Sequence, residues 1–274
     1  WIHANIKSWY VREDRIKRLG ERLQKYTNIV AICEAMKEST IELFPYLKDK
    51  IIRIYNPFNF ERVIKKSEES IDENLKEYYD KDFIVSIMRL TEHQKDFDTL
   101  ILGLKLTKEK GVMEKLYILG DGPDREKIEE KIKKEGMENE IILLGNVKNP
   151  YPWIKKAKML VHSSKYEGLP TVLIEALILD KIVISSDCPT GPREILDNGK
   201  YGSLVEVGDC NSMAQEILEL LQENSIKKEK YLSNIDESVE RFDKKNHSYY
   251  ILFHVSYRMC VSSLSTRLQS NCWA

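Results

Sequence analysis

The sequence predicts an α/β protein whose parallel sheet is covered by helices on both faces. From about residue 83 onward, short apolar runs alternate with longer stretches whose apolar residues follow helical spacing. Connections rich in Gly, Pro, Asn and Asp follow several of these runs. Strands and helices that alternate in this way form parallel sheets, and strands buried on both faces are apolar throughout. With 274 residues, the chain is long enough to bury a sizeable core.

The predicted elements follow one another in a regular order. Five apolar runs are predicted as strands, at residues 83–87, 115–119, 141–144, 159–161 and 182–185. Helical spacing lies between them, as in Phe97, Leu100, Ile101 and Leu104, and again in Ile128 and Ile132. Ligands of open α/β sheets bind where the strands end, so we expect a site in the loops that follow these strands.

The composition argues against several classes of function. The 43 basic and 44 acidic residues give a formal net charge of −1, so bulk electrostatics do not predict binding to nucleic acid. The 5 cysteines are scattered without CxxC spacing, which indicates reduced thiols and neither a zinc site nor a disulfide framework. No apolar stretch approaches the roughly 20 residues of a membrane span, and no signal peptide is evident. We expect a cytoplasmic protein whose contact with a membrane would be peripheral, at the inner face of the plasma membrane.

A glycine-led helix start within residues 166–176 predicts a phosphate site. The helix is expected to begin near Pro170, because proline is tolerated at the first helical position. Free amides at this point would face open space with the positive end of the helix dipole behind them, which suits phosphate. The contacts are expected from Gly168, Leu169, Pro170 and Thr171.

Two glutamates eight positions apart, Glu167 and Glu175, flank this helix start. Glu175 lies about five residues into the helix, roughly 7 Å along its axis, on the same face as Thr171. That distance suits a carboxylate that binds a ribose while the helix start holds the phosphates of the same ligand. Isolated glutamates are usually exposed surface residues, but the sequence between these two favours a site for a diphosphate-linked sugar.

The motif resembles the Glu-x7-Glu motif of the retaining glycosyltransferase family 4, the group 1 glycosyltransferases, which have the GT-B fold. Other segments resemble the family's landmarks in the same order along the chain: residues 54–58, 88–90 with 94–95, 118–123, 144–147 and 187–194. Together the landmarks cover roughly residues 51–245. Each is weak alone, but their common order makes the resemblance specific.

The resemblance implies a role for each matching side chain. Arg89 and Lys95 would stabilise the leaving nucleoside diphosphate, Arg89 as a bidentate fork and Lys95 as a point charge. Glu167 would meet the donor sugar, and Glu175 would bind the ribose hydroxyls. His3 resembles a histidine that follows a strand of the acceptor domain and faces the donor sugar, although a lone histidine is more often structural or exposed.

Three loops are expected to border the donor. Gly120 is explained equally well by a close backbone approach to the ligand and by turn geometry. Asn146 and Val147 resemble the place where the family's backbone contacts the base. Residues 187–194 hold two prolines and a glycine, which fit either a simple turn or a rigid loop, and we favour a loop that borders the donor pocket.

A metal site is not expected. Asp96, Phe97 and Asp98 spell DxD, the metal-binding pattern of a different glycosyltransferase fold. We interpret the two acids as part of a helical first turn, where negative charge is favourable. Asp96 also departs from the resembling family, in which glycine or asparagine is common after the lysine, and the loop between Arg89 and Lys95 is one residue longer than usual. Neither GxxxxGK[ST] nor GxGxxG occurs, so a P-loop NTPase and a dinucleotide oxidoreductase have no support.

The resemblance divides the chain into three parts. Residues 1–55 are expected to be the remnant of an N-terminal, acceptor-binding Rossmann-like domain, since the chain begins with Trp1 and most of that domain would lie upstream. Residues 56–246 are expected to form the C-terminal, Rossmann-like nucleotide-sugar domain of a GT-B fold. Residues 247–274 do not resemble the family's closing helix and are expected to be an atypical tail.

The implied activity is transfer of a hexosyl unit from a nucleotide diphosphate sugar, such as a UDP-sugar, to a hydroxyl acceptor with retention of configuration. No cofactor is expected. The acceptor would be a glycan or glycolipid of the cell envelope, which is an inference by family analogy. Two alternatives remain open: a non-catalytic nucleotide-sugar-binding fragment, and a sugar-nucleotide epimerase of the same fold class.

Overall fold

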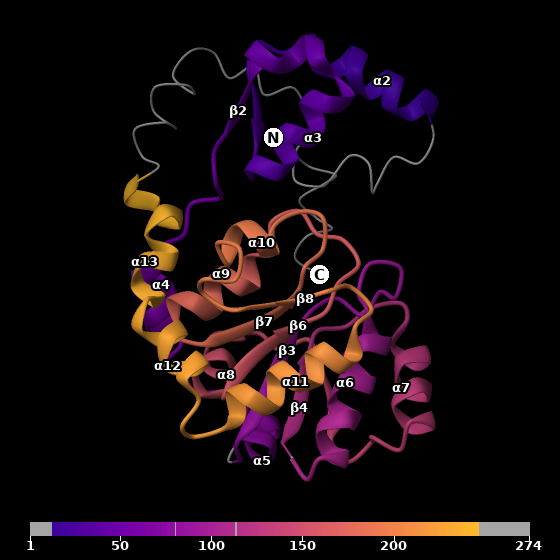
Figure 1. Ribbon diagram of the computed structural model, residues 1–274, viewed down its shortest axis with the longest axis vertical. Coiled ribbons are helices and arrows are strands. Elements are labelled where there is room, and N and C mark those ends of the chain that lie inside the picture. Colours follow the sequence, from indigo (N-terminus) through magenta and orange to yellow (C-terminus); the bar gives the residue numbers. More distant parts are fainter. Residues whose placement is uncertain (1–12, 80, 113, 247–274) are drawn as a thin grey trace.

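A six-stranded parallel sheet forms the centre of the larger part of the molecule (Figure 1). The computed structural model describes residues 13–79, 81–112 and 114–246. The strand order is β5-β4-β3-β6-β7-β8, and every neighbouring pair is parallel. The strands are β3 (Phe83–Ile87), β4 (Lys115–Leu119), β5 (Ile141–Gly145), β6 (Met159–His162), β7 (Ile182–Ser186) and β8 (Ser203–Val205). The α/β prediction is therefore confirmed.

Helices cover both faces of this sheet because successive strand residues point to opposite sides. Phe83 and Val85 of β3 belong to one apolar core, whereas Ile84 belongs to the other. The first core packs under α4 (Phe60–Lys66), α8 (Tyr151–Lys156), α9 (Thr171–Ile178) and α13 (Ile235–Val239). The second packs under α6 (Phe97–Glu109), α7 (Arg125–Lys134), α11 (Cys210–Leu221) and α12 (Ile226–Ser233). Shorter pieces are η2 (Glu73–Leu75), α5 (Lys76–Tyr79), α10 (Pro192–Ile195) and η3 (Glu240–Phe242).

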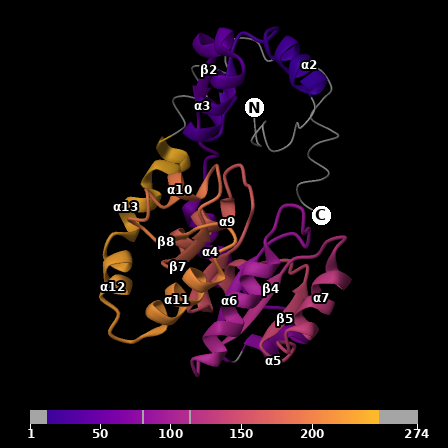
Figure 2. The same ribbon diagram turned by 45° about the vertical axis from the view of Figure 1, so that its right-hand side comes forward.

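A smaller part of the chain stands apart from this sheet (Figures 1 and 2). It consists of α2 (Glu13–Leu23), β1 (Ile29–Ala31), α3 (Glu34–Leu43), η1 (Pro45–Lys50) and β2 (Ile51–Arg53). Its two strands pair only with each other, in parallel, with Ile29 opposite Ile51. The smaller part is thus a β-α-β unit with α2 in front of it.

The segment that joins the two parts is held by the end of the described chain. Phe58 donates a backbone hydrogen bond to the carbonyl of Phe242 at 2.9 Å and accepts one from Lys244 at 2.9 Å. The ring of Tyr55 lies edge-on to that of Phe242, with 4.8 Å between the centroids. Residues 242–244 therefore lie beside the connection, and Figure 1 shows α13 next to the segment that follows β2.

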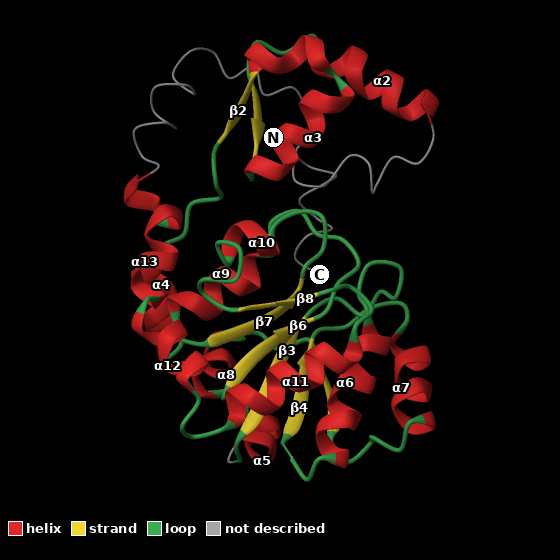
Figure 3. Cartoon of the chain, viewed as in Figure 1, coloured by secondary structure: helices red, strands yellow, loops and turns green. Residues whose placement is uncertain are grey.

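The carboxyl ends of the central strands face the smaller part. Loops gather between the sheet and the smaller part in Figure 3, and the one after β7 leads into α10, whose Glu194 contacts α3. Parallel strands bring all their carboxyl ends to one edge, so the loops expected to form the site meet there.

Candidate functional site

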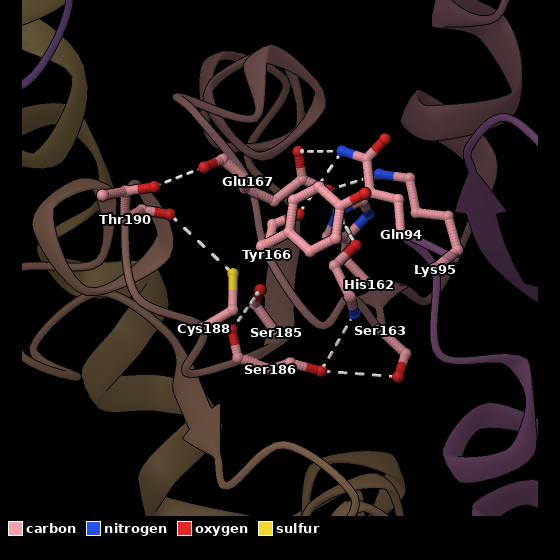
Figure 4. Close-up of polar contacts among 11 residues, drawn as sticks. Gln94, Lys95, His162, Ser163, Tyr166, Glu167, Ser185, Ser186, Cys188 and Thr190 are labelled. Atoms are coloured by element: carbon pink, nitrogen blue, oxygen red, sulfur yellow. Dashed lines mark hydrogen bonds and ion pairs between the residues drawn. The ribbon is translucent and has the colours of Figure 1, made fainter. Parts of the chain in front are cut away.

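The predicted site residues Lys95 and Glu167 meet at the ends of β3 and β6 (Figure 4). Backbone hydrogen bonds join the two loops, since Asp96 N–H donates to the Ser163 carbonyl at 3.1 Å and Lys165 N–H donates to the Gln94 carbonyl at 2.8 Å. This pairing places Lys95 opposite Ser164. The structure therefore brings together two of the predicted residues that are 72 positions apart.

The carboxylate of Glu167 is buried, and most of its contacts are made by one oxygen, Oε1. It forms an ion pair with Lys95 Nζ and accepts hydrogen bonds from Ser164 Oγ at 2.7 Å and His162 Nε2 at 3.0 Å, all at Oε1. Among the residues that the structure describes, Gln94 Nε2, at 3.3 Å, is the single hydrogen-bond donor to Oε2. Burial would raise the pKa of Glu167, but the His162 hydrogen bond and the Lys95 charge outweigh it and hold the pKa well below the usual range. Glu167 is therefore ionised, with Oε2 as its least satisfied oxygen.

His162 is the main site residue that the sequence analysis missed. It is the last residue of β6, and its side chain is 1% exposed. Burial and the positive charge of Lys95 lower its pKa, so the ring is neutral and donates through Nε2 to Glu167. Nδ1 is then an acceptor, and among the described residues this buried atom has no hydrogen-bond partner. The signal in the sequence was a polar side chain at the end of an apolar run.

Arg89 and Lys95, expected to act as two cations on one ligand, have different environments. Arg89 is exposed, and its side chain makes no ion pair or hydrogen bond within the part of the chain that the structure describes. Lys95 is only 9% exposed and is already neutralised by Glu167. Arg89 is thus the freer of the two to meet an anion.

The predicted helix start is confirmed to within one residue. Helix α9 begins at Thr171, and Pro170 is its N-cap with φ −66°. Thr171 is exposed, Gly168 is half-buried and Leu169 is buried. The first N–H groups of a helix have no partner inside it, so this turn presents donors to a ligand.

Glu175, one turn into α9, faces the start of α8. Tyr151 donates its hydroxyl hydrogen to Glu175 Oε1 at 3.2 Å. Burial raises the pKa of Glu175 against the effect of this hydrogen bond. Asn146 is exposed and Val147 is half-buried in the loop that leads from β5 to Tyr151. The structure therefore connects Glu175 with the loop in which base contacts are predicted.

Backbone conformation and packing both require glycine at position 120. Its φ is +131°, and a Cβ there would lie 2.1 Å from the carbonyl oxygen of Met88. Its N–H also donates to the Gly145 carbonyl at 2.8 Å. These contacts account for the glycine through the close approach of neighbouring strand ends, and its contact with a donor stays a prediction.

Residues 187–194 connect the Glu167 loop with the smaller part of the chain. Thr190 donates its hydroxyl hydrogen to the carbonyl of Glu167. The carboxylate of Glu194 accepts hydrogen bonds from the N–H groups of Glu34 at 2.9 Å and Ala35 at 3.4 Å, at the first turn of α3. It also accepts the hydroxyl hydrogen of Tyr55 at 2.6 Å. Glu194 therefore caps a helix that has no side-chain cap of its own.

A hollow of about 710 Å³ lies between α3 and this loop. Charged side chains of both signs line it, including Arg53, Arg193, Glu38 and Glu194. Apart from the predicted loop at residues 187–194, none of the donor-site residues predicted from the sequence lines it. The hollow and the Glu167 site are thus neighbours that share the loop at residues 187–194.

Replacing Glu194 by glutamine should lower the free energy of unfolding by about 2–3 kcal/mol, because hydrogen bonds to a charged group are lost and an amide N–H₂ faces backbone donors. Urea denaturation of the whole chain measures this effect. The matched control is Glu38→Gln, in the helix α3 that Glu194 caps. The exposed side chain of Glu38 has no partner among the described residues. Equal stabilities of the two variants would show that the Glu194 cap contributes nothing.

Comparison with known protein families identifies the family of the chain. The model of the family "Glycosyl transferases group 1" matches residues 67–239. The chain belongs to this family. The match includes β3 to β8 together with Arg89, Lys95, Glu167 and Glu175.

Several group 1 glycosyltransferases are similar in sequence. An uncharacterized glycosyltransferase, MJ1059, of Methanocaldococcus jannaschii is 39% identical over 174 residues, which are 63% of this chain and 43% of that protein. The N-acetylgalactosamine-N,N'-diacetylbacillosaminyl-diphospho-undecaprenol 4-alpha-N-acetylgalactosaminyltransferase of Campylobacter jejuni is 32% identical over 207 residues, which are 76% of this chain and 54% of that protein. The chain thus spans about half the length of these relatives.

Solved glycosyltransferase structures share the fold. Anabaena HepE in complex with UDP-glucose superimposes with a TM-score of 0.80 at 19% identity, covering 93% of this chain and 71% of HepE. TarM superimposes with a TM-score of 0.73 at 23% identity, covering 91% of this chain and 48% of TarM. The fold is therefore of the GT-B type.

The structure explains the DxD sequence of this group 1 glycosyltransferase as a helix start. Asp96 is the N-cap of α6 and accepts the Thr99 hydroxyl hydrogen at 2.7 Å. Asp98 pairs with Lys131 at 2.7 Å. Within residues 13–79, 81–112 and 114–246, no group of three or more His, Cys, Asp or Glu side chains is arranged to hold a metal ion.

Two of the sequence predictions fall outside the described residues. His3, predicted to face the donor sugar, is one, and the tail at residues 247–274 is the other. In the described ranges, no helix is both long enough and apolar enough to traverse a lipid bilayer.

Proposed function

We propose that the protein is the donor-binding part of a retaining family 4 glycosyltransferase, which transfers a hexosyl unit from a nucleotide diphosphate sugar to a hydroxyl of a cell-envelope glycan or glycolipid. The observation that carries the proposal is the meeting of Lys95 and Glu167 beside the first turn of α9, with Glu175 one turn further along. Solved structures with this fold include complexes of TarM with UDP and of HepE with UDP-glucose, which supports a UDP-sugar as the donor.

The arrangement suits each portion of such a donor. The unpaired N–H groups of α9 and the exposed Arg89 would hold the diphosphate, and Glu175 would accept the ribose hydroxyls. The base would lie against Asn146 and Val147. Glu167 Oε2 would accept a hydrogen bond from a hydroxyl of the sugar.

The chemistry would rest on stabilising the departing diphosphate. Negative charge grows on the leaving oxygen as the glycosidic bond breaks, and donors fixed in advance lower the barrier without reorganising. Arg89 and the α9 amides would supply these donors, while Lys95, held by Glu167 Oε1, would add a positive charge nearby. No cofactor or metal ion is part of the proposal.

The smaller part of the chain would be the end of an acceptor-binding domain, so that the acceptor approaches from that side of the Glu167 site. This placement fits the contacts that Glu194 makes with α3. We place the protein in the cytoplasm, in peripheral contact with the membrane that carries its acceptor, because relatives act on undecaprenol-linked substrates by name. A non-catalytic nucleotide-sugar-binding role is the second candidate.

Titration of the chain with UDP, GDP and ADP by calorimetry tests the proposal. We expect one nucleoside diphosphate to bind, and we expect Arg89→Ala to weaken it about 10- to 100-fold, since a charged hydrogen bond contributes about 1.5–3 kcal/mol. Glu175→Ala should weaken the same ligand. Arg22→Ala, an exposed arginine of α2, is the matched control and should bind normally. Binding that survives both site variants would refute the assignment of the site.

A further inference from the structure

The hydrogen bond between Tyr151 and Glu175 joins the two helices that flank the predicted nucleoside position. Tyr151 is the first residue of α8, directly after the loop that holds Asn146 and Val147. Its hydroxyl lies 3.2 Å from Glu175 Oε1, and both side chains are half-buried. No motif in the sequence indicates a role for Tyr151.

The start of α8 is fixed by contacts on its other side. Asn149 Oδ1 accepts the backbone N–H of Tyr151 at 3.2 Å. Asn149 Nδ2 donates to the carbonyl of Lys66 at 2.8 Å and to Glu69 Oε2 at 2.7 Å. Pro150, with φ −80°, is the N-cap of the helix. The Tyr151 ring therefore projects from a backbone that is tied to the end of α4.

Glu175 has spare hydrogen-bonding capacity. Within the described part of the chain, Tyr151 is the sole hydrogen-bond partner of its carboxylate, and no cation pairs with that carboxylate. An ionised carboxylate has about four acceptor sites, so the Tyr151 bond leaves Oε2 open. A vicinal diol presents two O–H donors and matches such a carboxylate, whereas a phosphate presents only acceptors and would be repelled.

We propose that Tyr151 is a positioning residue that orients Glu175 toward the ribose diol, and that the pair makes the site select ribonucleoside diphosphates over their 2′-deoxy counterparts. The inference rests on the proposed function, because it takes a nucleoside diphosphate as the ligand. The N-terminus of α9 and Arg89 would bind the diphosphate of either ligand. Selection at the sugar ring would come from the Glu175 carboxylate, whose direction Tyr151 sets.

A merely structural hydroxyl would behave differently. If Tyr151 served only to satisfy a half-buried carboxylate, its removal would loosen the fold and weaken all ligands in equal proportion. A positioning role instead confines the loss to ligands that carry the 2′-hydroxyl. The ratio of two affinities therefore separates the two roles even when stability also changes.

The test is calorimetric titration of the whole chain with UDP, 2′-deoxy-UDP and inorganic diphosphate. The wild type should prefer UDP to 2′-deoxy-UDP by about 10-fold, since one hydrogen bond to a charged group is lost. Tyr151→Phe should weaken UDP about 5- to 10-fold, reduce that preference, and leave inorganic diphosphate unchanged. Tyr78→Phe is the control, because the Tyr78 hydroxyl has no hydrogen bond within the described residues.

Glu175→Gln gives a second variant that retains the side-chain size. It should reduce the preference in the same way, and the double variant with Tyr151→Phe should lose little more, because the two residues act as one unit. Equal losses for all three ligands, or an unchanged preference in Tyr151→Phe, would overturn the inference. A wild-type chain that binds inorganic diphosphate and both nucleotides equally would overturn it too, leaving the diphosphate site in place. Absence of all binding by the wild type would reject the proposed function itself.

Discussion

Replacing Lys95 by methionine should lower the free energy of unfolding by about 3–5 kcal/mol. The ion pair with Glu167 is buried on both sides, with 9% and 8% of the two side chains exposed. Methionine fills similar space but leaves a carboxylate in a buried site without its cation, and a buried unpaired charge is strongly destabilising. Urea denaturation at neutral pH measures the loss.

Two further variants isolate this effect. Adding Glu167→Gln to Lys95→Met removes the stranded charge and should recover most of the stability. Lys158→Met breaks two surface ion pairs, with Glu114 and Asp82, and should change the free energy of unfolding by less than about 1 kcal/mol. Because Lys95 and His162 lower the pKa of Glu167, the stabilisation is complete above the ordinary carboxyl pKa of 4.5 and is lost as the pH falls below it. If Lys95→Met lost the same free energy of unfolding at acidic pH as at neutral pH, the electrostatic explanation would be contradicted.

Replacing Gly120 by alanine should lower the free energy of unfolding by about 3–4 kcal/mol. A residue with a side chain is strained at φ +131°, at about 1–3 kcal/mol, and the new Cβ would meet the Met88 carbonyl oxygen at 2.1 Å. The strand ends that would have to move carry the loop with Arg89. Thermal unfolding measures the loss, and UDP titration should show weaker binding in the same variant.

Gly208→Ala is the matched control for Gly120. Its φ is +88°, but a Cβ added there would have nothing within 4 Å. The free energy of unfolding of this variant should therefore fall only by the cost of backbone strain, about 1–2 kcal/mol. If the two alanine variants lose the same free energy of unfolding, the clash between the new Cβ and the Met88 carbonyl costs nothing, and the packing explanation fails.

The sequence predicted most of the sheet. The strands at residues 83–87 and 115–119 agree with the structure residue for residue, and three others end one residue later than predicted. Continuous apolar runs identify strands buried on both faces, which is why this signal was reliable. β8 was missed because its three residues, Ser203–Val205, are too short to show a pattern.

The site was predicted only in its local parts. The spacing of Glu167, Pro170 and Glu175 depends on one helix, so it could be read from neighbouring residues. The pairing of Lys95 with Glu167 depends on a crossing of two loops 72 residues apart, and no local pattern encodes it. His162 was overlooked for the same reason, because its partner is defined by the loop that folds back over β6.

The cap that Glu194 provides for α3 should form late in folding. The smaller part of the chain has only a two-stranded sheet, and such a sheet is marginal by itself in water. The hydrogen-bond acceptor for the first turn of α3 is Glu194, 160 positions later in the sequence. Forming this contact closes a long loop, and the loss of chain entropy must be offset by the apolar core of the larger part. During synthesis, α3 therefore leaves the ribosome long before Glu194 is made, and we expect its first turn to become stable only after β7 has joined the sheet.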